Sequence, residues 1–73
     1  IDFVLRGEFI TLDALLKATG LASSGGIAKQ MIGAGLVEVD GNPELRKTCK
    51  IRCGQSVRSG DETVQVIGKP ASD

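Results

Sequence analysis

Histidine, tryptophan and tyrosine are absent from the 73-residue sequence, and phenylalanine, cysteine and proline occur only twice each. Without histidine, a serine or cysteine nucleophile lacks its usual general base, and a metal site lacks a common nitrogen ligand. Two acid pairs, Asp40 with Glu44 and Asp61 with Glu62, fall in turn-like segments where carboxylates are ordinary. We therefore expect that the protein is not an enzyme and that it uses no cofactor, metal or small-molecule substrate.

The two cysteines, Cys49 and Cys53, lie in an alternating apolar and polar pattern that predicts a strand. On a strand their Cα atoms would be about 13 Å apart, whereas a disulfide needs Cα atoms within about 7 Å. The alternation puts both cysteines on the core side with Ile51. We expect buried or half-buried reduced thiols, which fits a cytoplasmic protein. A thiol or metal sensor would instead need both thiols exposed.

Long apolar segments are also missing. No stretch approaches the roughly 20 residues of a membrane span, and no signal-peptide pattern is visible, so we expect no membrane contact. The length allows one domain with a small core of Leu, Ile and Val. We predict that this domain covers residues 1–68 and that residues 69–73 fray. The chain begins at Ile1 and not at Met, which leaves room for residues ahead of it.

Two short amphipathic helices are predicted in the first half of the chain, after a possible edge strand at residues 2–5. Thr11 is a natural N-cap for the first helix. Its apolar residues recur at 3.6-residue spacing until Gly20 ends it. The second helix has four apolar residues on one face. They are Ile27, Ala28, Met31 and Ile32.

The start of the second helix is unusual in composition. Ser23 or Ser24 caps it, and Gly25 and Gly26 occupy its first turn although each costs up to about 1 kcal/mol relative to Ala. The two glycines indicate either close packing against the first helix or room for a ligand near exposed N–H groups. Lys29 lies one turn later, on the polar side of the helix.

The second half of the chain alternates apolar and polar residues, which predicts short antiparallel strands. The first strand covers residues 36–39, and Asp40-Gly41 is a strong hairpin-turn signal. The strands expected after this turn cover residues 48–53, 56–58 and 63–67. This order predicts an α+β fold, with two short helices packed on a small antiparallel sheet of three to five short strands.

Positive charge is concentrated in one part of a neutral chain. The sequence has nine basic and nine acidic residues, yet five basic residues and no acid lie between Glu44 and Asp61. A patch of one sign can focus a local field, although an ordinary solvated strand face can have the same composition. Because this segment has no stacking aromatic, the pattern favours backbone recognition of structured RNA over stacking of single-stranded bases.

The order of these motifs resembles the RNA-binding domain first recognised in ribosomal protein S-four, also called the alpha-L motif. The resemblance covers about residues 10–58. It is carried by Leu12-Asp13, Gly20, Ser24, Ala28, Ile32, Gly35 and Val37-Glu38-Val39-Asp40-Gly41, followed by Lys47, Lys50 and Gly54. Gly25 departs from the family pattern, which usually has Arg after the helix-two serine. The variant Ser24-Gly25-Gly26-Ile27-Ala28-Lys29, followed by Glu44 and Arg46, resembles the small stand-alone bacterial members.

The resemblance implies a monomeric, cytoplasmic and ribosome-associated bacterial protein that binds structured RNA, with ribosomal RNA as one candidate. Ser24 and Gly25 would allow close approach of the RNA, and Lys29 would replace the missing Arg. Arg46 also admits a structural role as the partner of Glu44. The full set of predicted RNA-binding residues is Ser24, Gly25, Lys29, Arg46, Lys47, Lys50 and Arg52. The alternative is a protein-docking module of the ribosome or another assembly, which a large exposed apolar patch beside the hairpin would favour.

Overall fold

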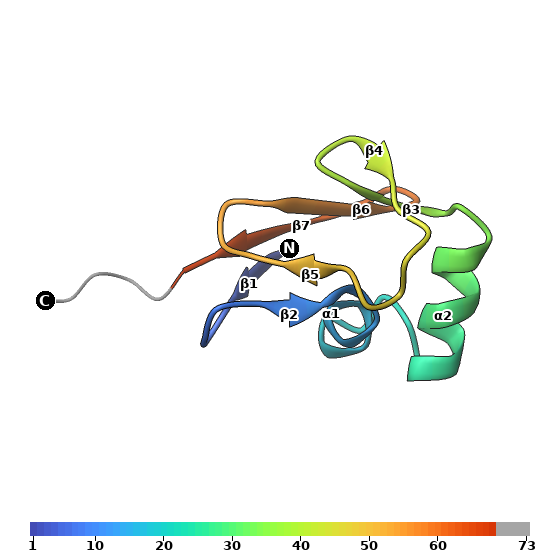
Figure 1. The fold of residues 1–73 in the computed structure, drawn as a ribbon, viewed down its shortest axis with the longest axis horizontal. Helices are drawn as coiled ribbons and strands as arrows, with labels where there is room; N and C mark the ends of the chain where they lie inside the picture. The colour runs from blue at the N-terminus through green and yellow to red at the C-terminus, as the bar shows by residue number, and fades with distance from the viewer. Residues whose placement is uncertain (69–73) are drawn as a thin grey trace, which may run out of the picture.

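Two helices, a five-stranded sheet and a two-stranded ribbon make up the computed structural model, which describes residues 1–68 (Figure 1). The fray predicted for residues 69–73 lies outside the described residues. The elements are β1 (Asp2–Val4), β2 (Ile10–Thr11), α1 (Leu12–Ala18), α2 (Gly25–Gly33), β3 (Val37–Val39), β4 (Asn42–Pro43), β5 (Lys50–Ile51), β6 (Ser56–Ser59) and β7 (Glu62–Ile67).

The sheet has the strand order β1-β7-β6-β3-β4 and is mixed rather than antiparallel. The pairs β7–β6, β6–β3 and β3–β4 are antiparallel, whereas β1 runs parallel to β7, with Phe3 opposite Val66. The predicted α+β class and the edge position of β1 are therefore confirmed, and the purely antiparallel sheet is corrected. A parallel pair joins segments that are distant in sequence, so no local turn signal reveals it.

The predicted hairpin turn is present at Asp40-Gly41. Both residues have positive φ, 53° and 86°, as a two-residue turn that matches strand twist requires. The return strand is β4 itself, since Val39 pairs with Asn42. The prediction that residues 48–53 form a strand of this sheet is wrong, because only Lys50–Ile51 is extended there and it pairs with β2.

The β2–β5 ribbon leads directly into the start of α1. Ile10 pairs with Ile51 and Thr11 with Lys50. The next two backbone N–H groups also donate to this segment, at 2.9 Å from Leu12 to the Cys49 carbonyl and at 3.1 Å from Asp13 to the Lys47 carbonyl. Thr11 is the N-cap residue, as predicted, but its side chain makes no capping hydrogen bond. The 47–49 loop instead accepts N–H groups that the first turn of a helix cannot satisfy internally.

The core lies between the two helices, the ribbon and the sheet. It contains Leu5, Leu12, Leu15, Leu16, Ala22, Ala28, Ile32, Val37, Val39, Ile51, Val57, Val64 and Val66. Ala28 and Ile32 of α2 are buried as predicted, but Met31 is only partly buried and Ile27 is 41% exposed. Gly20 follows α1 with φ of 81°, which supports the predicted helix end. Within residues 1–68, neither helix has the length and apolar character needed to cross a membrane.

Candidate nucleic-acid interface

The start of α2 has a side-chain cap and exposed backbone. Ser24 is the cap, since its hydroxyl oxygen accepts the Ile27 N–H at 3.2 Å. The N–H groups of Gly25 and Gly26 precede the first intrahelical hydrogen bonds, so the helix offers them no acceptor. No acidic residue lies in this first turn. The helix dipole and these N–H groups therefore present partial positive charge that no neighbouring carboxylate of the turn offsets.

Close helix packing does not explain the two glycines. A Cβ atom placed on Gly25 would meet nothing within 4 Å, and one placed on Gly26 would meet only the Ser24 hydroxyl oxygen at 3.8 Å. Neither glycine has a positive φ. Alanine would therefore fit at both positions without strain. The close packing that the sequence left open is therefore not observed, and room for a ligand stays a prediction.

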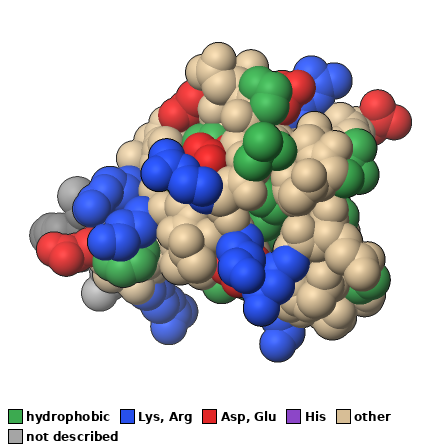
Figure 2. Space-filling model, turned by 45° about the vertical axis from the view of Figure 1, so that its right-hand side comes forward, with side chains coloured by type: hydrophobic (Ala, Val, Ile, Leu, Met, Phe, Trp, Pro, Cys, Tyr) green, Lys and Arg blue, Asp and Glu red, His purple; other side chains and the backbone are tan. Residues whose placement is uncertain are grey.

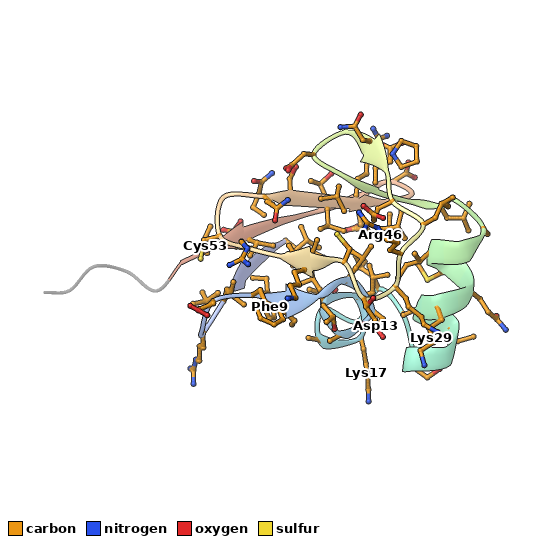
Figure 3. All side chains as sticks on the ribbon, in the orientation of Figure 1. Phe9, Asp13, Lys17, Lys29, Arg46 and Cys53 are labelled. Carbon is orange, nitrogen blue, oxygen red and sulfur yellow. The ribbon has the colours of Figure 1, made fainter. Side chains whose placement is uncertain are left out.

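Lys29 is exposed on α2, the helix that packs against α1. In Figure 3, Asp13 and Lys17 of α1 lie in the same lower region, and Lys17 extends away from the body of the molecule. The Asp13 carboxylate accepts the Ala14 N–H at 2.9 Å and is partly buried. Lys17 is a further exposed cation in this region, and the sequence analysis did not single it out. The helical spacing of the apolar residues already placed it on the polar side of the first helix.

Arg46 has the structural pairing that the sequence allowed. The Glu44 carboxylate accepts both the backbone N–H of Arg46, at 3.0 Å, and its Nε, at 3.4 Å. The backbone hydrogen bond is the largest of the effects that lower the pKa of Glu44. The Arg46 side chain is nevertheless 82% exposed. Its charge is therefore partly compensated, while much of its guanidinium still faces solvent.

The other cations of the second half lie on backbone that is fixed at several points. The Lys47 carbonyl accepts from the start of α1, and Lys50 is in β5. The Arg52 N–H donates to the side-chain oxygen of Gln55 at 2.8 Å, and the Gln55 amide nitrogen donates to Asp40 at 3.1 Å. Lys47, Lys50 and Arg52 are all exposed. Their backbone is held in place while their charged ends stay in solvent.

An aromatic side chain that sequence reasoning left out lies beside two of these cations. The Lys50 ammonium nitrogen is 5.0 Å from the centre of the Phe9 ring, and the Arg52 guanidinium carbon is 5.8 Å from it. These distances fall within the range of cation–π interaction. Phe9 is 40% exposed and precedes β2 (Figure 3). The basic segment itself has no aromatic residue, but the β2–β5 pairing brings Phe9 beside its cations from far away in sequence.

The cysteines differ from each other in environment. Cys49 is partly buried, and burial, together with the nearby Glu44 carboxylate, raises the pKa of its thiol. Cys53 is exposed, contrary to the prediction, because β5 ends at Ile51 and the chain turns at Gly54, which has φ of 90°. Both thiols are free. Residues 1–68 contain no group of three or more side chains arranged to hold a metal ion.

In Figure 2, many of the visible Lys and Arg side chains lie in the left and lower parts of the face, while others lie near its centre and upper right beside acidic side chains. Of the five predicted cations, only Arg46 has an ion pair within the described part of the chain. We call the predicted set of seven residues, together with Phe9, the basic surface. Its members come from α2 and its N-cap, from the loop before β5, and from the ribbon and the residues that flank it. They are Phe9, Ser24, Gly25, Lys29, Arg46, Lys47, Lys50 and Arg52.

The fold and the basic surface together define a class of protein. It consists of small α+β modules with two short helices on a mixed sheet and cations on an adjoining loop, and it is the class that the sequence resembles. The model of the S4 domain family matches residues 3–67. The chain therefore belongs to the S4 domain family, and the resemblance is confirmed.

Two relatives and one solved structure are similar to this chain over most of their length. The protein named "Putative RNA-binding protein YbcJ" of Escherichia coli K12 is 47% identical over 58 residues, which are 80% of this chain and 83% of the relative. "Uncharacterized protein YbcJ" of Shigella flexneri has the same identity and coverage. The solution structure of E. coli YbcJ, described as revealing an alpha-L motif involved in RNA-binding, matches with a TM-score of 0.71 and 43% identity. It covers 90% of this chain and 85% of the other.

Proposed function

We propose that this protein binds structured RNA, mainly through phosphate contacts made by the basic surface. The observation that carries the proposal is the solvent exposure of its cations together with the lack of ion pairs, for most of them, among the described residues. Lys29, Lys47, Lys50 and Arg52 are exposed, and no ion pair engages them within residues 1–68. Membership of the S4 domain family and the name of the E. coli relative support RNA as the polyanion. No step of this proposal involves catalysis.

The chemistry of the basic surface suits a folded RNA backbone. Lys47 and Lys50 supply compact charges that bind phosphate oxygens without demanding one geometry. The first N–H groups of α2, beside Ser24 and Gly25, suit an anion that approaches closely. Lys29 lies one turn further along the same helix. Because double-stranded RNA is recognised mostly by shape and by phosphate and sugar contacts, such a surface fits a structured target.

The finer parts of the proposal concern the target and the setting. We infer that the RNA is ribosomal RNA, that the protein acts as a monomer and that it works in the bacterial cytoplasm. The bacterial relatives support the setting. The monomer is supported by the β4 edge of the sheet, which is two residues long and contains Pro43, since short and proline-bearing edges resist pairing with a second chain. Crosslinking followed by sequencing of the bound RNA tests the target.

Charge reversal on the basic surface tests the proposal directly. The double change Lys47→Glu and Lys50→Glu should abolish binding to structured RNA at 50 mM salt, because both side chains are exposed and face phosphates in the proposed complex. Binding is measured by titration of a labelled folded RNA, and circular dichroism checks that the fold is kept. Arg58→Glu is the control, since Arg58 lies on β6 and donates to the Gly60 carbonyl outside this surface. Unchanged binding by the double variant would contradict the site.

The alternative of protein docking has one observation in its favour. Leu36 and Leu45 are 59% and 63% exposed on either side of the β3–β4 hairpin. Pull-down before and after nuclease treatment separates the two functions. Partners that are lost with the RNA support RNA binding, whereas contacts that survive nuclease and disappear with Leu45→Ser support docking.

A further inference from the structure

A pocket opens beside Phe9, along β1 and the segment that connects it to β2. Its volume is about 420 Å³, and it is lined by Phe3, Val4, Leu5, Arg6, Phe9 and Ile10. Small-molecule sites commonly have volumes of about 300–1,000 Å³ and apolar walls with a few polar groups. Arg6 is the charged member of this lining. The pocket therefore combines an apolar wall with one cation at its margin.

Phe9 belongs to both the pocket and the basic surface. It lines the pocket, and its ring is also within cation–π distance of Lys50 and Arg52. Ile10 pairs with Ile51, and Phe9 and Arg52 are the residues that flank this pair in the sequence. An exposed aromatic ring therefore lies next to two cations that have no ion pair within residues 1–68.

The charges around this pocket indicate what kind of group it receives. A purely apolar ligand would gain nothing from Arg6 in the lining or from Lys50 and Arg52 beside the Phe9 ring, so these charges favour an anionic ligand. A nucleotide has both required parts, because its base presents a flat π-face and its phosphates carry the negative charge. Aromatic side chains and Arg guanidinium planes are the usual stacking partners of unpaired RNA bases.

We propose that Phe9 and its pocket receive one unpaired nucleobase of the bound RNA, stacked on the Phe9 ring. The phosphates flanking this nucleotide contact Lys50 and Arg52. This inference rests on the proposed RNA binding and narrows it, because a uniform duplex has no base to offer. The protein therefore prefers a helix interrupted by a bulge or loop.

The test compares two hairpin RNAs that differ only by a single bulged nucleotide in the stem. In each, the same non-nucleotide linker replaces the loop, so the unbulged hairpin offers no unpaired base. The native chain should bind the bulged hairpin about 5- to 150-fold more tightly, the range of one base–aromatic stack. Phe9→Leu keeps an apolar side chain and removes the ring, so the ratio of its affinities for the bulged and unbulged hairpins should fall to about one. Leu45→Ala is the matched control, because Leu45 is an exposed apolar residue outside the pocket.

A second measurement uses the native chain alone. The fluorescence of 2-aminopurine at the bulged position should fall on binding, since stacking quenches it. Equal affinity for the two hairpins, or unchanged fluorescence, would overturn the nucleobase site while leaving phosphate binding intact. Failure of the native chain to bind either hairpin would overturn the proposed function as well. Continued preference for the bulge in Phe9→Leu would show that another residue reads it.

Discussion

At the scale of single residues, Gly25 is the clearest departure from what a helix alone would select. Alanine would fit there without a clash, and the first-turn position requires no positive φ. Glycine in a helix costs about 0.5–1 kcal/mol relative to alanine. A residue that weakens its own helix without a packing reason is expected where a ligand must approach the backbone closely.

We predict that Gly25→Ala raises the free energy of unfolding by about 0.5–1 kcal/mol and weakens RNA binding, because the added methyl group keeps phosphate from the first-turn N–H groups. Urea unfolding and RNA titration measure the two effects. Gly33→Ala, at the other end of α2, is the matched control, because its added methyl group would meet nothing within 4 Å and its φ is not positive. It should stabilise the helix while leaving RNA affinity unchanged. A stabilised Gly25→Ala variant with native affinity would remove Gly25 from the basic surface.

At the scale of elements, Asp40 connects the β3–β4 hairpin to the start of β6. Its carboxylate accepts the Ser56 N–H at 3.0 Å and the Gln55 side-chain amide at 3.1 Å, and its own N–H donates to the Ser56 carbonyl at 2.8 Å. The Ser56 N–H and then Gln55 lower the pKa of Asp40. Because the charged form is favoured in the folded state, the contribution to stability is present above the unperturbed pKa of about 3.9 and is lost as the pH falls below it.

We predict that Asp40→Asn lowers the free energy of unfolding at pH 7 by less than about 1 kcal/mol, since solvent screens an exposed carboxylate. Asparagine tolerates the positive φ of this position, so the turn itself should survive. The difference from the native chain should shrink between pH 4 and pH 2, as measured by urea unfolding. Asp61→Asn, in the turn between β6 and β7, is the control. A difference that stays constant with pH would show that the charge of Asp40 is not involved.

Elements governed by local rules were predictable from the sequence. The apolar spacing of the helices, the Ser24 cap and the Asp40-Gly41 turn each depend on residues only a few positions apart. The parallel β1–β7 pair and the β2–β5 ribbon were not, because each joins segments distant in the chain. The Phe9 contact and the exposure of Cys53 were missed for the same reason, since both depend on where β5 finds its partner and ends.

At the scale of the whole molecule, the chain is neutral overall, yet several Lys and Arg side chains lie on the face shown in Figure 2, and within residues 1–68 Arg46 alone of the predicted cations has an ion pair. The predicted residues do lie on connected elements, although whether RNA contacts each of them stays a prediction. The number of phosphates that they neutralise is a property of the surface as a whole. It is best measured through the counterions that the RNA releases on binding.

We predict that log affinity falls linearly with log salt with a slope of roughly −2 to −4.5, which corresponds to three to five neutralised phosphates. Between 50 and 200 mM salt, the affinity should then fall by about 15- to 500-fold. Titrations at several salt concentrations measure the slope. The Lys47→Glu and Lys50→Glu chain, wherever its binding is still measurable, should have a shallower slope. An affinity that hardly changes with salt would contradict a complex based on phosphates.

The hydrogen bonds from the start of α1 to the Lys47 and Cys49 carbonyls have an energetic consequence for association. They hold the loop before β5 in one conformation in the absence of RNA, as the ribbon holds Lys50. A loop that is already ordered loses little conformational entropy when its ligand arrives. The interaction energy of each cation can then appear as affinity instead of being offset by the freezing of a mobile chain, which suits a domain with so small a surface.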